Sequence, residues 1–119
     1  MGAFSRRIRV SVPRMGVGEA AATTLALVMH ELATNSMKYG ALSSDVGTLD
    51  VSGSLEGDDI KIVWMERGGP IVGTSKPDGY GSRLVDRSVK GQLGGTIDYE
   101  WEPSGLIVKL SLKASKLAN

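Results

Sequence analysis

Residues 27–43 constrain the fold of this chain most strongly, because they have the spacing of one long amphipathic helix. Apolar side chains in this stretch and just before it recur at steps of three and four residues, namely Leu25, Val28, Met29 and Leu32. We therefore predict a helix from about residue 19 to residue 39 that buries this stripe. Gly40 follows the last turn and is predicted to stop the helix in a left-handed conformation, which glycine adopts without steric penalty.

A second stripe of the same helix is polar. Glu31, Asn35 and Lys38 are four and three residues apart, so their side chains share one face. A carboxylate, a neutral amide oxygen and an ammonium group suit a magnesium-bound phosphate, because Mg²⁺ prefers oxygen ligands and takes several from phosphates and water. The alternative is an ordinary half-exposed helix face, in which Glu31 forms an ion pair with Lys38.

The composition limits the other kinds of site that this chain can form. Its 119 residues include no cysteine and a single histidine, His30, which excludes disulfides, thiolate catalysis and a histidine-rich metal site. The net charge of +1 does not indicate binding to nucleic acid. No apolar run approaches the roughly 20 residues that span a bilayer, and a secretory signal pattern is absent. We expect one cytoplasmic domain over residues 1–119, with no membrane contact by this segment.

Alternating polar and apolar residues predict a strand in each of five places, at residues 5–12, 47–55, 60–66, 96–101 and 106–112. The first is expected to be half-buried, with Arg6 and Arg7 at a solvated strand end. Trp64 falls in phase with the inward side chains of the third strand, which favours a core position over contact with a ligand. The polar tail from Lys113 is expected to fray.

A glycine-rich and proline-rich segment, residues 67–80, separates the third strand from a second helix predicted at residues 82–91. Such a segment lets backbone approach a ligand closely, although it can also be a plain surface connection. Ser82 is a suitable N-cap for the second helix, and its inward side chains are predicted to be Leu84, Val85 and Val89. The order of elements predicts an α/β (α+β) fold, a two-layer sandwich of a mixed, mainly antiparallel sheet with helices on one face.

The start of the second helix is a candidate phosphate site. The chain lacks the Gly-x-x-x-x-Gly-Lys-Ser/Thr pattern of a P-loop. Gly79 and Gly81 precede the helix instead, and the unpaired N–H groups of its first turn, around Ser82 and Arg83, suit an anion. Arg83 can add a charge-assisted bond to a phosphate oxygen, or it can be an ordinary solvated arginine.

Three motifs in this order resemble those of bacterial sensor histidine kinases of the HWE group. Residues 30–43 read His-Glu-Leu-Ala-Thr-Asn-Ser-Met-Lys-Tyr-Gly-Ala-Leu-Ser, which is similar to the group's N box with its histidine. Residues 64–66 read Trp-Met-Glu, which matches the Trp-x-Glu signature. Residues 79–84 read Gly-Tyr-Gly-Ser-Arg-Leu, which resembles the glycine-rich lid and the helix after it. The resemblance implies the ATP-binding sandwich of the GHKL superfamily, known as the Bergerat fold, which gyrase and MutL share.

The resemblance assigns nucleotide-binding roles at the end of the third strand. Glu66-Arg67-Gly68-Gly69-Pro70 is similar to the superfamily's Asp-x-Gly-x-Gly, with glutamate for aspartate and proline for the last glycine. It implies that Glu66 accepts a hydrogen bond from the amino group of adenine and that Gly68 lies against the nucleotide. An ionised carboxylate only accepts, so it favours ATP over GTP, whose base presents a carbonyl at that position. The alternative for Glu66 is a surface glutamate at a strand end.

The resemblance also assigns roles on the first helix. It implies that Asn35 coordinates Mg²⁺ through its amide oxygen, that Lys38 faces the phosphates, and that Glu31 acts on the attacking group. His30 lies about 100° around the helix from Glu31, so it is either a catalytic or a structural histidine. Tyr39 either lines the nucleotide pocket or packs at the helix end.

The implied function is transfer of the ATP γ-phosphoryl group to a histidine on a separate dimerisation domain, with a response regulator downstream. The sequence contains no such acceptor domain, so the isolated chain is expected to bind ATP and turn over slowly. Two alternatives remain open from the sequence: a non-catalytic module that keeps the fold as an interaction surface, and a serine kinase that acts on a regulator protein.

Overall fold

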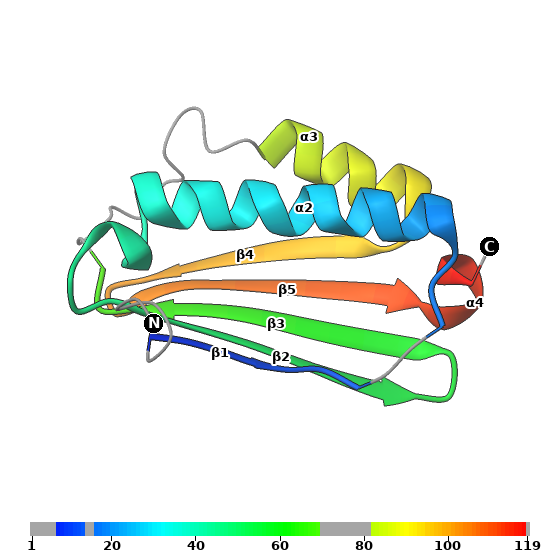
Figure 1. The fold of residues 1–119 in the computed structure, drawn as a ribbon, viewed down its shortest axis with the longest axis horizontal. Helices are drawn as coiled ribbons and strands as arrows, with labels where there is room; N and C mark the ends of the chain where they lie inside the picture. Colours follow the sequence, from blue (N-terminus) through cyan, green and yellow to red (C-terminus); the bar gives the residue numbers. More distant parts are fainter. Residues whose placement is uncertain (1–6, 14–15, 70–81, 119) are drawn as a thin grey trace.

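A computed structural model describes residues 7–13, 16–69 and 82–118 of the chain. Its five strands form one sheet in the order β1-β2-β3-β5-β4 (Figure 1). The strands are β1 (Ile8–Ser11), β2 (Thr48–Glu56), β3 (Asp59–Arg67), β4 (Thr96–Glu102) and β5 (Gly105–Lys113). Only the pairing of β1 with β2 is parallel, and the other three pairings are antiparallel. The predicted mixed, mainly antiparallel sheet is confirmed.

The two longer helical segments lie on the same side of this sheet (Figure 1). They are α2 (Glu19–Lys38) and α3 (Ser82–Arg87), and α3 continues into the π-helical turn η2 (Ser88–Gln92). The 3-10 turn η1 (Ala41–Ser43) follows α2, and α4 (Ala114–Leu117) ends the described chain. This two-layer arrangement confirms the predicted fold class. Among the described residues, no helix combines the length and apolar character that a membrane span needs.

The core lies between the helices and the sheet. Alternation along β3 and β5 points every second side chain toward the helices, where they are almost fully buried: Ile60, Ile62, Trp64, Leu106, Val108, Leu110 and Leu112. The helices contribute Val28 and Leu32 from α2, together with Val85 and Val89. The predicted inward position of Leu84 is wrong, because Val85 and Val89 form the buried stripe and Leu84 points about 100° away from it into solvent.

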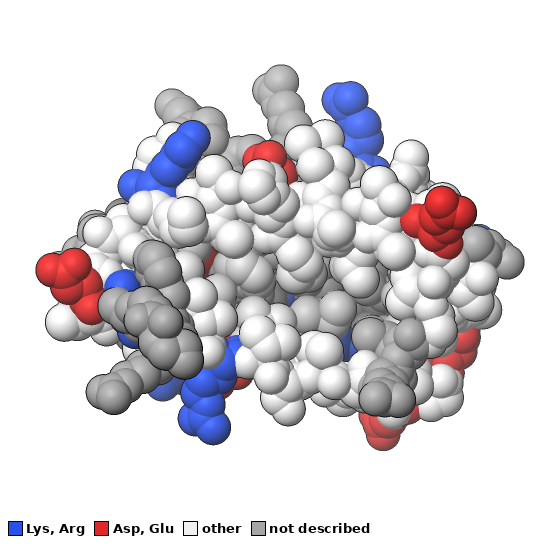
Figure 2. Space-filling view, viewed as in Figure 1, with Lys and Arg blue, Asp and Glu red and all other residues white. Residues whose placement is uncertain are grey.

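The first strand is present but is not half-buried as predicted. The side chain of Val10 is 64% exposed, because β1 is the edge strand of the sheet and α2 does not cover it. An open apolar groove of about 410 Å³ lies between α2 and this edge, with Met29, Met37 and Leu49 among its lining residues. On the face drawn in Figure 2, charged side chains gather toward the rim and few lie in the middle.

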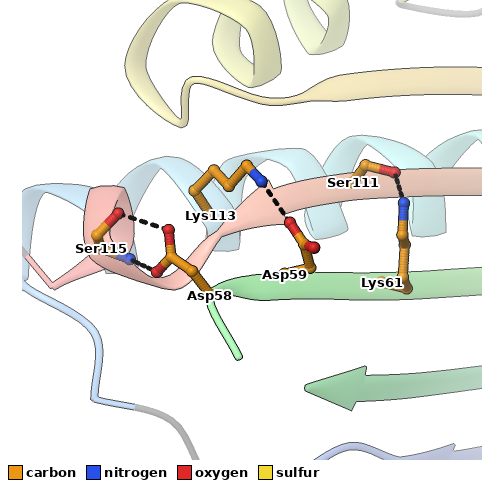
Figure 3. Close-up of polar contacts among 6 residues, drawn as sticks. All are labelled: Asp58, Asp59, Lys61, Ser111, Lys113 and Ser115. Atoms are coloured by element: carbon orange, nitrogen blue, oxygen red, sulfur yellow. Dashed lines mark hydrogen bonds and ion pairs between the residues drawn. The ribbon is translucent and has the colours of Figure 1, made fainter. Parts of the chain in front are cut away.

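The C-terminal tail is ordered by tertiary contacts, so the predicted fraying is wrong. The side chain of Leu117 is fully buried, and its carbonyl accepts a 2.6 Å hydrogen bond from the Gly18 amide. The carboxylate of Asp58, in the β2–β3 turn, accepts bonds of 2.7 Å from the Ser115 amide and 2.8 Å from the Ser115 hydroxyl (Figure 3). The turn therefore caps α4 from a distant part of the sequence.

Close by, further side chains link β3 to β5 on the exposed face of the sheet (Figure 3). Lys113 pairs with Asp59, and Lys61 donates a 2.9 Å hydrogen bond to the Ser111 hydroxyl. The hydrogen bond and the charge of Lys113 lower the pKa of Asp59. Because this pair is exposed, solvent screens it and it adds little to stability.

We expect Tyr99 to ionise late in an alkaline titration. Burial raises its pKa well above the ordinary value, and the nearby Asp86 carboxylate raises it further. The folded state therefore favours the neutral phenol, so this contribution to stability is intact below about pH 10 and is lost as the pH rises further. Tyrosinate absorbance measures this directly, because Tyr99→Phe should remove the late-ionising component. A late component that survives Tyr99→Phe would contradict the assignment.

Candidate functional site

The polar stripe of α2 forms as its spacing predicts. Glu31, Asn35 and Lys38 lie on successive turns of the helix, which ends at Lys38. Their burial differs: Asn35 is only 4% exposed, Glu31 is half-buried, and Lys38 is exposed. The amide thus lies in the interior at the C-terminal end of α2, with an ammonium group one turn further toward solvent. His30 is exposed, which excludes a buried structural role for it.

Glu66 is a buried carboxylate at the end of β3. It is 2% exposed, which excludes the alternative of a surface glutamate. Its Oε2 accepts a 2.7 Å hydrogen bond from the indole Nε1 of Trp64, and its Oε1 accepts a 3.0 Å bond from the backbone amide of Ala41. Because side chains two residues apart on a strand share a face, Trp64 can reach the carboxylate along β3. The amide of Ala41 reaches it from η1, the turn that follows α2.

Gly40 approaches the same carboxylate and does not have the predicted left-handed conformation. Its φ is −108°, in the extended region open to any residue. A Cβ atom on Gly40 would lie 2.1 Å from Oε1 of Glu66 and 3.2 Å from the Cα of Ser36. Glycine is therefore required here by the closeness of the carboxylate rather than by the backbone angle.

Two glycines after β3 bring backbone against the loop that follows α2. Gly68 has a positive φ of 79°, and its carbonyl accepts a 3.1 Å bond from the Ser44 hydroxyl. A Cβ on Gly69 would lie 2.6 Å from the Cα of Ala41. Gly68, predicted to lie against a nucleotide, thus shapes the turn that packs β3 onto the end of α2.

Arg7, immediately before β1, forms hydrogen bonds to the loop at residues 41–47. The prediction that Arg7 lies at a solvated strand end is therefore wrong. Its guanidinium donates to the backbone carbonyl of Gly47 at 2.7 Å, to that of Ala41 at 3.4 Å, and to that of Ser44. The five fixed donors of a guanidinium suit several carbonyls at once. Nothing local in the sequence distinguishes this arginine from an exposed one. The role of Arg7 and the amide of Ala41 were therefore missed.

The remaining predicted site residues are only partly described. Gly79 and Gly81 lie outside the described residues. Ser82 and Arg83 occupy the first turn of α3, but their side chains lie outside the described part, so neither the N-cap nor the phosphate contact is tested.

The donor set on α2 fits Mg²⁺ that arrives with a phosphate ligand. Within the described residues, no three or more His, Asp or Glu side chains cluster to hold a metal on their own. The predicted ligand is instead the Asn35 amide oxygen, with the Glu31 carboxylate one turn earlier on the same face. Mg²⁺ binds to proteins in this way, through one or two oxygen ligands, with phosphates and water completing its shell.

Comparison with known proteins shows which proteins this chain is similar to. No family model matches the sequence. The chain is 39% identical over 112 residues to blue-light-activated histidine kinase 1 of Erythrobacter litoralis, and this match covers 92% of the chain and 31% of the relative. It is 37% identical over 109 residues to a blue-light-activated histidine kinase of Brucella anthropi, covering 88% of the chain and 22% of that protein. The chain is homologous to histidine kinases.

Solved histidine kinase structures share its fold. The histidine kinase domain of an Erythrobacter litoralis blue-light activated histidine kinase superimposes with a TM-score of 0.75 and 17% identity, covering 95% of the chain and 55% of that structure. The catalytic domain of the histidine kinase ThkA gives 0.70 and 13%, covering 90% of the chain and 79% of that structure. At these identities the likeness shows the fold, which is that of a histidine kinase catalytic domain. The chain spans less than a third of the curated histidine kinases it matches.

Proposed function

We propose that this chain is the ATP-binding catalytic domain of an HWE-group sensor histidine kinase, and that residues 1–119 form one domain. It would transfer the ATP γ-phosphoryl group to a histidine on a separate dimerisation domain of its parent protein. The observation that carries the proposal is the buried carboxylate of Glu66 bound to the Ala41 amide. Because Ala41 lies in the turn after α2, Glu66 lies beside the end of the helix that bears Asn35 and Lys38, which supports its proposed role as the adenine acceptor. The histidine kinase names of the relatives support the same function.

Glu66 is proposed to select adenine. Each oxygen of a carboxylate has two lone pairs, and among the described residues Trp64 and Ala41 each engage one lone pair of a different oxygen. The second lone pair of either oxygen can accept from the 6-amino group of adenine. These lone pairs would repel the carbonyl oxygen of guanine, so ATP should bind in preference to GTP.

The helix α2 is proposed to handle the phosphates. Asn35 would hold Mg²⁺ through its amide oxygen, and Lys38 would face the phosphate oxygens from the exposed end of the same stripe. When bound, Mg²⁺ would neutralise charge on the phosphates. Glu31, half-buried one turn before Asn35, can polarise the attacking group or accept its proton. His30 stays a candidate catalytic residue from the resemblance alone.

We propose that residues before and at the start of α3 also contribute to the site, and that phosphoryl transfer needs other domains of the parent protein. Gly79, Gly81, Ser82 and Arg83 keep their predicted role toward the phosphates. Because phosphoryl transfer depends on positioning the acceptor, we expect slow turnover until the dimerisation domain supplies its histidine. A response regulator would then receive the phosphoryl group.

Mg²⁺-dependent ATP binding tests the proposal. Calorimetry on the chain should detect ATP, with higher affinity in Mg²⁺ than in EDTA. Asn35→Ala should abolish the difference between the ATP affinities in Mg²⁺ and in EDTA. We expect that difference to be at least about tenfold, because even residues that only hydrogen-bond to a metal ligand change metal affinity by that much. Thr34→Ala, the neighbouring residue on another face of α2, should keep it. Circular dichroism confirms that each variant is folded.

The outcomes separate the competing functions. No detectable binding at high ATP would contradict the proposal and favour a non-catalytic module. If ATP binds, radiolabelled ATP and the acceptor domain of the parent protein identify the reaction. Acid-labile label on that domain indicates phosphohistidine, whereas acid-stable label on a regulator protein indicates a serine kinase.

A further inference from the structure

A buried hydrogen bond joins the indole of Trp64 to the carboxylate of Glu66. Trp64 is a core side chain, 3% exposed, yet its single polar atom faces the carboxylate at 2.7 Å. The second donor to Glu66, the amide of Ala41, is also neutral. A carboxylate held by neutral donors keeps its negative charge available to a ligand, because these donors do not neutralise it.

The two donors also fix the orientation of the carboxylate. One oxygen is held along β3 by the indole and the other from η1 by the amide, so rotation about the terminal torsion would break both bonds. A buried carboxylate without its donors would be strongly disfavoured. The lone pairs that Trp64 and Ala41 do not engage therefore point in set directions before any ligand arrives, which reduces the entropy lost when a ligand binds.

We propose that Trp64 is a positioning residue for base recognition: its indole N–H aims the Glu66 carboxylate at the 6-amino group of the nucleotide base. The inference rests on the proposed function and deepens it. It also assigns a chemical role to the tryptophan of the Trp-x-Glu pair, which alternation along the strand otherwise explains only as a core side chain. The indole ring fills the core, while its N–H group sets the geometry of the recognition site.

A comparison of two ligands separates positioning from packing. Purine riboside triphosphate keeps the ring system and phosphates of ATP but lacks the 6-amino group. Trp64→Phe keeps an aromatic ring in the core and removes the N–H donor. We expect this variant to bind ATP about three- to tenfold more weakly, as for the loss of one hydrogen bond that orients a charged group, and to bind the analogue as the wild type does.

Ile62→Val is the matched control. Ile62 is buried on the same face of β3, two residues from Trp64, and has no polar side-chain atom. This variant loosens the same part of the core, so it should not change the ratio of the two affinities. Calorimetry of all three proteins with both ligands, in Mg²⁺, gives the ratios directly.

A second measurement uses the intact protein, in case Trp64→Phe does not fold. The chain has two tryptophans, so its ¹H–¹⁵N spectrum has two indole signals, and Trp101→Phe identifies the one from Trp64. ATP should shift the Trp64 indole signal, because a new donor on Glu66 changes the bond that the indole makes. The analogue should shift it much less.

The results distinguish this inference from the proposed function. If the wild type binds neither ligand, the proposed function fails. If it binds both but Trp64→Phe weakens them equally, or if both ligands shift the indole signal equally, Trp64 is a packing residue and the inference is overturned.

Discussion

Gly40→Ala should abolish ATP binding and destabilise the fold. The added Cβ would lie 2.1 Å from Oε1 of Glu66, so the carboxylate must leave its position. It would then lose its hydrogen bonds to Trp64 and Ala41, each worth about 1.5–3 kcal/mol for a charged partner. We expect the free energy of unfolding to fall by about 3 kcal/mol or more on this basis. Denaturant unfolding and calorimetry with Mg-ATP measure the two effects.

Gly91→Ala is the control for this substitution. Gly91 lies in η2, where an added Cβ would have no heavy atom within 4 Å and where φ is not positive. Alanine there should leave stability unchanged or raise it slightly, because alanine has less conformational freedom to lose on folding. Gly91→Ala should bind ATP like the wild type. If Gly40→Ala does so too, the carboxylate of Glu66 is not the adenine acceptor in the position described.

Leu117→Ala should destabilise the fold as strongly as a central core substitution. Leu117 is fully buried although it lies in the last described turn, so truncation leaves a cavity and is expected to cost about 2–5 kcal/mol. Thermal or denaturant unfolding measures this loss. Leu84→Ala removes the same atoms from an exposed leucine of α3 and should cost much less. Equal effects of the two substitutions would mean that the tail does not pack as described.

Much of the architecture follows from local pattern. The 20-residue helix α2 and the hairpins β2–β3 and β4–β5 were predicted from periodicity and turn residues, because a stripe of apolar side chains every three to four or every two residues specifies each element. The incorrect predictions concern segments whose structure depends on residues far away in the sequence. Asp58 and Gly18 order a tail that looks disordered by its own composition, and the missing cover over β1 leaves Val10 exposed.

The site was predicted less completely, for a related reason. Motif resemblance identified Asn35 and Glu66, and the burial of both agrees with their proposed roles. Alternation also placed Trp64 and Glu66 on one face of a strand. The hydrogen bond between them depends on side-chain conformation, which the sequence pattern does not specify. The Arg7 contacts join residues 34 to 40 positions apart, a distance over which no local pattern operates.

Because these contacts converge on one turn, the proposed site forms only when distant parts of the chain have all folded together. Arg7 immediately before the first strand, Glu66 at the end of the third, and the turn after the long helix all meet at Ala41. A partly folded chain in which any one of these three segments is out of place lacks the complete binding site. Ligand binding therefore draws on the fully folded population alone, so saturating nucleotide should raise the melting temperature of the entire unit in one transition.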